Sequence, residues 1–143
     1  MTTADFIKNT YGVPSTRDRH CSSVFTDRNG NVYSYGYHYP LAFKIDGLNF
    51  INVAGYSSTT AKHIAWAKWA IGYYNYIPVK LQGERLQYGL TLDKIKVLLE
   101  AELSEIHLQM YSKTRHDTAV YRHLMEQEDR VMTDINKVVE VLV

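Results

Sequence analysis

The sequence predicts an α+β protein: a small antiparallel sheet of about four strands, made of two hairpins, packs on a buried helix and is followed by a C-terminal helical hairpin. Three observations predict this fold class. Two turn signals lie between short apolar runs, helical periodicity replaces two-residue alternation after Gly55, and a heptad-like repeat marks the last third of the chain. With 143 residues, 45% of them hydrophobic and 22% charged, the composition is globular and the length suits one domain with an appendage.

These patterns divide the chain into four segments. They are a polar N-terminal segment (1–23), the hairpins and the buried helix (24–72), a connector (73–90) and the helical extension (91–143). A short helix near residues 4–9 is compatible with the first segment, which is otherwise expected to be irregular.

The two hairpins are indicated by their turns. Strands at 24–26 and 32–35 flank Asn29-Gly30, a pair that supplies the positive φ angles of a tight hairpin turn. Asp46-Gly47 plays the same part between strands at 41–45 and 48–54. Pro40 separates the hairpins, at a joint where a missing N–H does least harm.

The helix expected at residues 61–71 begins after four hydroxyl residues that can cap it and stops at Gly72. Apolar residues, including Trp66 and Trp69, cover most of its circumference. A helix with that pattern is usually buried on more than one side, so we expect it between the sheet and the C-terminal third.

The C-terminal third is expected to be two helices, the first capped by Thr91 and ending near Tyr111, the second reaching almost to Val143. Apolar positions of the first are Leu92, Ile95, Leu98, Leu99, Ile106 and Met110. A coiled-coil-like seam in the second comprises Tyr121, Leu124, Glu128, Val131, Ile135, Val138 and Leu142, with Glu128 as its polar interruption. Such a seam packs within the monomer or forms a homodimer through the last helix.

Charge and cysteine content narrow the function classes. A net charge of +1 excludes an acidic DNA mimic, although residues 1–88 carry +4 and residues 89–143 carry −3, so an anionic ligand should prefer the N-terminal part. One thiol, Cys21, cannot form an internal disulfide, and neither a metal site nor a cofactor is expected. With no signal peptide or membrane span in the sequence, a cytoplasmic protein is expected.

Four tyrosines at two-residue spacing are the first candidate site. On a continuous strand, Tyr33, Tyr35, Tyr37 and Tyr39 would share one face. They could stack unpaired bases of a single-stranded nucleic acid, at roughly 1–3 kcal/mol per base, or pack against the two tryptophans of the helix. Packing is the favoured interpretation, because an RNA-binding signature is absent.

The second candidate is the polar helix start. Ser57, Thr59, Thr60 and Lys62 could bind an anion at the helix N-terminus, or the hydroxyls could simply cap it. His63 follows one turn later, and His38 lies after the first hairpin.

If they converge, the two imidazoles could support acid–base cleavage of a phosphodiester, or nucleotide binding, together with Lys62 and Thr59/Thr60. A carboxylate to orient either imidazole is missing from these stretches, as are the common nucleotide-loop, serine-hydrolase and zinc-protease motifs. A catalytic residue is therefore not assigned.

A longer pattern joins these stretches. It consists of Tyr-Ser-Tyr-Gly-Tyr-His-Tyr-Pro-Leu-Ala from Tyr33, Asn52, and Gly-Tyr-Ser-Ser-Thr-Thr-Ala-Lys-His from Gly55. Over residues 24–70 the chain resembles a small domain of bacteriophage and plasmid proteins without an assigned activity. The resemblance implies that one constellation contains Tyr35, His38, Tyr56, Thr59, Thr60 and His63.

It also implies a biological context. Many small phage accessory proteins act by binding a host or defence protein, for example by inhibiting an RNA-guided nuclease. We therefore expect an accessory protein that acts by binding, through residues Tyr35, His38, Tyr56, Ser57, Thr59, Thr60, Lys62 and His63. The nucleic-acid binder and the phosphodiester-cleaving enzyme remain alternatives.

Overall fold

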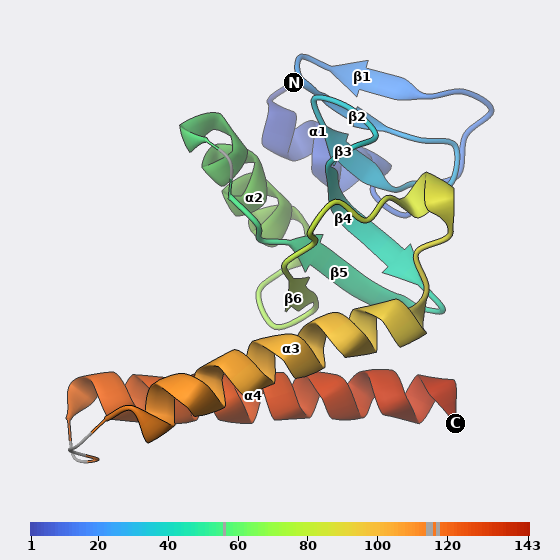
Figure 1. Cartoon of the computed structure of the whole chain (residues 1–143). Helices are drawn as coiled ribbons and strands as arrows, with labels where there is room; N and C mark the ends of the chain where they lie inside the picture. Colours follow the sequence, from blue (N-terminus) through green and yellow to red (C-terminus); the bar gives the residue numbers. More distant parts are fainter. Residues whose placement is uncertain (56, 114–115, 117) are drawn as a thin grey trace. The chain divides into compact units, whose positions relative to one another are not determined.

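The computed structural model describes residues 1–55, 57–113, 116 and 118–143 (Figure 1). They form two compact units, Met1–Leu90 and Thr91–Val143. The first unit contains a mostly antiparallel sheet with helices, and the second contains two long helices, so the predicted α+β class is confirmed. The elements of the first unit are α1 (Thr3–Thr10), β1 (Arg19–Cys21), β2 (Val24–Thr26), β3 (Val32–Ser34), β4 (Pro40–Ile45), β5 (Leu48–Asn52), α2 (Ser58–Ile71), β6 (Ile77–Val79) and the short 3-10 helix η1 (Leu86–Tyr88).

The sheet has six strands in the order β1-β2-β3-β4-β5-β6, rather than the four or so expected. Neighbours are antiparallel except β5 and β6, which are parallel because α2 carries the chain back between them. The two strands that the sequence did not reveal are the edges. β1 contains the polar residues Arg19 and His20, and β6 contains Pro78, which an edge strand tolerates because one side needs no donor.

The two predicted hairpins are present, with different turns. Asp46 and Gly47 both have positive φ (49° and 84°), as expected for a two-residue turn. In the first hairpin only Gly30 has positive φ, and the Asp27 carboxylate accepts hydrogen bonds from the N–H groups of Asn29 and Asn31 at 2.9 Å each. That turn is therefore a longer loop built around Asp27.

The continuous tyrosine strand does not form. β3 ends at Ser34, Tyr35 has a φ of +66°, and the N–H of Tyr39 donates to the carbonyl of Gly36 in a tight turn. Tyr33 and Tyr37 pack with Phe25 on one side of the sheet, whereas Tyr39 is buried in the core on the other. A turn between the second and third tyrosines therefore separates rings that the spacing placed together.

Helices α1 and α2 pack against one face of this sheet (Figure 1). The buried residues of this core are Phe6, Ile7, Val24, Val32, Tyr39, Leu41, Ala42, Ile51, Ile64 and Ala67. The expectation that α2 is buried on several sides is wrong. Its buried residues form one stripe, and Ala61, Ala65 and Trp69 on the outer side are exposed. Alanines favour helix without requiring burial, which made the helix look more enclosed than it is.

The second unit consists of α3 (Leu92–Tyr111) and α4 (Ala119–Leu142), which run antiparallel side by side (Figure 1). Leu124, Val131 and Val138 of the predicted seam are buried. Beyond Val131 the buried position is Asp134, whereas Ile135 of the predicted seam is only half-buried. The polar position Glu128 accepts a 2.7 Å hydrogen bond from His107 of α3.

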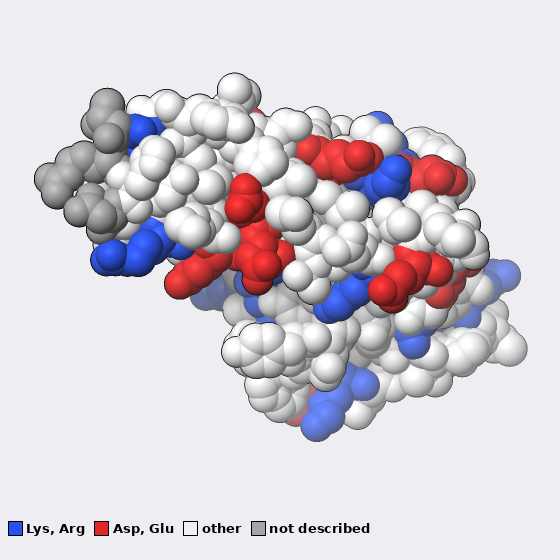
Figure 2. Space-filling model, turned by 90° about the horizontal axis from the view of Figure 1, so that it is seen from below, with Lys and Arg blue, Asp and Glu red and all other residues white. Residues whose placement is uncertain are grey.

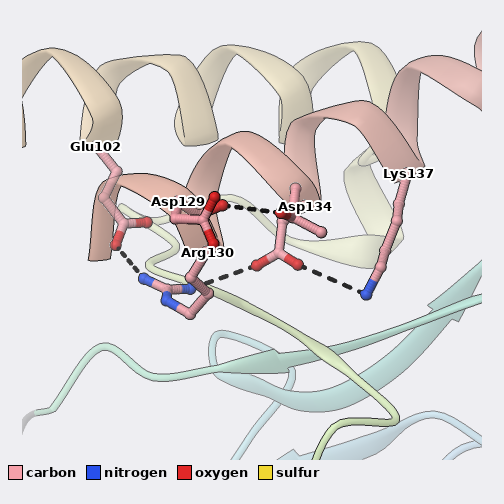
Figure 3. Close-up of polar contacts among 6 residues, drawn as sticks. Glu102, Asp129, Arg130, Asp134 and Lys137 are labelled. Carbon is pink, nitrogen blue, oxygen red and sulfur yellow. Dashed lines mark hydrogen bonds and ion pairs between the residues drawn. The ribbon is translucent and has the colours of Figure 1, made fainter. Parts of the chain in front are cut away.

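Asp134 is held by an ionic cluster within this hairpin (Figure 3). Its carboxylate lies 3.4 Å from Arg130 and 3.9 Å from Lys137, and Arg130 bridges to Glu102 of α3 at 2.9 Å. Burial raises the pKa of Asp134, against the opposing effect of the two cations. Acidic and basic side chains also lie next to one another on the face shown in Figure 2. None of the described helices is long and apolar enough to serve as a membrane span.

Candidate functional site

A pocket of about 190 Å³ lies where the β3–β4 turn meets the start of α2. We call it the motif pocket, because the residues that line it belong to the long sequence pattern. They are Ser34, Tyr35, His38, Tyr39, Ser57 and Thr60. The structure thus brings together four predicted site residues from two distant stretches, and it adds Ser34 and Tyr39.

Tyr35 lies at the edge of this pocket with an unusual backbone. Its φ of +66° is costly for a bulky side chain, yet 58% of the residue is exposed, so burial does not compensate for the strain. The turn is held by a 2.7 Å hydrogen bond from the Tyr35 N–H to the Ser23 carbonyl. The positive φ of Tyr35 is therefore a local cost in stability, and the ring that it positions is exposed beside the pocket.

His38 reaches the pocket because residue 36 is glycine. A Cβ on Gly36 would lie 2.7 Å from His38 Nδ1, so any larger residue would displace the imidazole. His38 is exposed and remains accessible to a ligand. The glycine of the Tyr-Ser-Tyr-Gly pattern is explained by this contact rather than by a positive φ.

Hydroxyl groups at the start of α2 cap the helix. Ser57 Oγ accepts the N–H of Thr60 at 3.2 Å and lies 3.2 Å from Thr60 Oγ1, so the predicted cap forms. Thr60 is buried, and Thr59 is half-buried outside the pocket lining. Lys62 is exposed and also outside the lining, while Tyr56 lies outside the described residues.

His63 is a buried bridge. With 2% exposure, its Nδ1 lies 2.6 Å from Ser34 Oγ and its Nε2 lies 3.2 Å from Ser23 Oγ. The rings of Tyr35 and Trp66 are each 5.6 Å from the imidazole. Burial lowers the pKa of His63 below its usual 6.5, so the ring is neutral at pH 7 and joins three chain segments through one donor and one acceptor.

The two histidines therefore occupy different environments. His38 lines the motif pocket, whereas His63 lies behind the lining residues Ser34 and Tyr35, and both of its nitrogens already have serine partners. The cleavage mechanism that requires both imidazoles at one ligand gains no support from this arrangement.

Tyr39 and Asn52 complete the pattern as structural residues. The Tyr39 hydroxyl donates to the carbonyls of Asn52, at 3.2 Å, and Ala54. Asn52 Oδ1 accepts the N–H groups of Ala54 and Leu81 at 3.1 and 3.2 Å, tying the loop before α2 to the connector. The sequence pattern included Asn52 without a role, and it placed Tyr39 with the other tyrosines on one strand face rather than as a hydrogen-bond donor to this loop.

A second pocket, of about 650 Å³, lies in the same unit. Its lining includes Asp18, Asp27, Tyr33, Tyr37 and Lys44. The Tyr33 hydroxyl donates to Asp27 at 2.8 Å and the Tyr37 hydroxyl donates to Asp18, which raises the pKa of Tyr37 to about 12. Because the carboxylates are already paired with these hydroxyls, the pocket offers a ligand less free polar capacity than its size suggests.

Within the described ranges, no three His, Cys, Asp or Glu side chains gather as metal ligands would. Comparison with known proteins gives one finding: residues 7–72 match the model of a family of unknown function (DUF8033). The match begins within α1, ends just after α2 and so contains the whole motif pocket. No curated protein and no solved structure matches the chain.

Proposed function

We propose that this protein acts by binding another protein through the motif pocket, with Tyr35 as the central contact. The observation that carries the proposal is the exposed, strained Tyr35 beside a small polar pocket. Tyr74 is also an exposed tyrosine with positive φ, so the position of Tyr35 beside the pocket is what points to a functional demand. Tyrosine is among the residues that contribute most to protein interfaces.

The motif pocket suits a partner side chain better than a whole substrate. At about 190 Å³ it is smaller than the sites that enclose drug-sized ligands. His38 provides a hydrogen-bonding group and Tyr35 provides apolar area, while the Ser34 and Ser57 hydroxyls are bonded to His63 and Thr60. His63 is neutral, and each of its ring nitrogens has a serine partner. This arrangement supports a structural role for His63 rather than a catalytic one.

The class of partner follows from the resemblance to phage and plasmid domains. We propose a host or defence protein, with an RNA-guided nuclease as one such target. The partner's contact with Tyr35 is the testable part of this proposal.

The experiment compares Tyr35→Ala with a matched control, Tyr74→Ala. Tyr74 is also a tyrosine with positive φ (76°), and it is 96% exposed. The tagged full chain is expressed in a bacterial host, co-purified proteins are quantified by mass spectrometry, and a recovered partner is purified for titration calorimetry.

We expect wild type and Tyr74→Ala to bind the same partner, and Tyr35→Ala to bind it at least about tenfold more weakly, as at an interface hot spot. His38→Ala should weaken binding less. Equal affinity of the Tyr35→Ala variant, with its fold verified by circular dichroism, would refute the proposal.

A further inference from the structure

The outer side of α2 carries a surface that the motif pocket does not use. The helix Ser58–Ile71 contains two lysines, two tryptophans and no acidic residue. Its buried stripe faces α1 and the sheet, which leaves Lys62 and Trp69, two turns apart, on the exposed side. Lys68 is half-buried at the flank of the same side.

Trp69 is the exposed aromatic centre of this surface. It is 49% exposed, and Lys8 Nζ of α1 lies 5.2 Å from its ring. After the helix ends at Gly72, Tyr73 and Tyr74 are also exposed. Large aromatic side chains beside lysines are the combination found where proteins bind unpaired nucleotides.

The distribution of charge also favours a nucleic acid as the ligand. Residues 1–88 carry a net charge of +4, against −3 for residues 89–143, so the unit that bears this surface is the one that attracts polyanions. Lys8 beside Trp69, and Lys62 and Lys68 on α2, supply three cations to this surface, and the single acidic residue of α1, Asp5, accepts a hydrogen bond from Thr2.

We propose that the outer side of α2 binds single-stranded nucleic acid, with Trp69 stacking on a base and Lys8, Lys62 and Lys68 contacting phosphates. A single strand is favoured over a duplex because a ring that stands out from a helix stacks on bases that are not already stacked. This surface excludes Tyr35 and the motif pocket, so the proposal stands independently of the protein partner.

Binding of fluorescein-labelled oligo-dT and oligo-rU to the full chain, measured by anisotropy from about 50 mM salt upward, tests the proposal. Three phosphate contacts predict that log K falls with log salt at a slope of about −2, and each Lys→Ala variant should reduce that slope by about 0.7. Trp69→Ala should weaken binding roughly tenfold, with quenching of tryptophan fluorescence in the wild type.

Two matched variants provide controls. Tyr88→Ala removes another exposed ring beside a cation, Arg85 at 5.4 Å, and Lys44→Ala removes an exposed lysine on β4. Both should bind as wild type does. The proposal fails if the oligonucleotides do not bind at low salt, if Trp69→Ala binds normally, if a duplex binds equally well, or if only anionic lipid vesicles bind.

Discussion

Individual residues of the long sequence pattern divide into two groups. Tyr39, Asn52, Thr60 and His63 are buried and hydrogen-bonded, and they fix the loops around α2. Tyr35 and His38 are exposed and face the motif pocket. The pattern therefore contains both the frame of a site and the groups that can touch a ligand, and only the second group is expected to change partner binding without unfolding the protein.

His63 should make the first unit sensitive to acid. Its folded-state pKa is below the unfolded value of about 6.5, so its contribution to stability is complete above that pH and is lost as pH falls through the folded pKa. We expect the free energy of unfolding to fall between pH 6.5 and the folded pKa by up to about 1.4 kcal/mol per pH unit.

Urea unfolding at several pH values, followed by tryptophan fluorescence, measures this effect. His63→Gln should be less stable at neutral pH but should show a flatter pH dependence. An unchanged slope in His63→Gln would assign the acid sensitivity to other groups.

Among the elements, turn and helix signals were readable and edge strands were not. Asp46-Gly47, the Ser57 cap, the stop at Gly72 and the Thr91 cap each have a local chemical cause, and each was predictable. β1 and β6 depend on pairing with a neighbouring strand, which a local pattern does not record. The strained turn at Tyr35 was hidden for the same reason, because a tertiary bond to Ser23 holds it.

The sequence predicted most of the residues that make up the candidate site, but not what each of them does there. Repeated hydroxyls and histidines marked the stretches that meet at the motif pocket. Burial decides which of them are available, and spacing alone could not distinguish the enclosed His63 from the exposed His38.

The first hairpin depends on close contact between two loops. A Cβ on Gly30 would lie 2.6 Å from the Val13 backbone nitrogen, and the Gly30 carbonyl accepts the N–H of Gly12 at 2.8 Å. Gly47 has nearly the same φ, 84° against 88°, but open space around it. Gly47→Ala should cost roughly 1 kcal/mol of backbone strain, and Gly30→Ala should cost at least about 2 kcal/mol more. Equal losses in chemical denaturation would show that the two loops move apart easily.

Asp134 should make the stability of the helical hairpin depend on pH in the direction opposite to that expected from His63. Because burial raises its pKa, the neutral carboxyl is favoured in the folded state, and stability is lost as pH rises through that pKa. Asp134→Asn should therefore raise the free energy of unfolding at pH 7 by about 1 kcal/mol, since half-buried Arg130 keeps its ion pair with Glu102 and exposed Lys137 stays hydrated. Asp129→Asn, at an exposed position on α4, should change thermal stability little; a marked loss in Asp134→Asn would mean that its ion pairs outweigh its burial.

At the scale of the whole molecule, the burial of His63 and of Asp134 predicts opposite pH dependences for the two units, which also contain different spectroscopic probes. Both tryptophans lie in Met1–Leu90, whereas α3 and α4 of Thr91–Val143 contain most of the helical residues. On lowering the pH from 7 to 5, the urea midpoint from tryptophan emission should fall while the midpoint from far-ultraviolet circular dichroism falls less or rises. Midpoints that coincide at both pH values would show that the chain unfolds as one cooperative system.

The strand order of the sheet is the order of the chain, so each strand from β2 onward pairs with the one made just before it. During synthesis on the ribosome, β1 through β5 can assemble one after another as they emerge, without waiting for distant sequence. Only β6 must wait, because α2 has to dock first. The β5 edge of the nascent sheet is therefore covered only once residues up to Val79 have left the exit tunnel, and β1 and β6 are the two edges of the finished sheet.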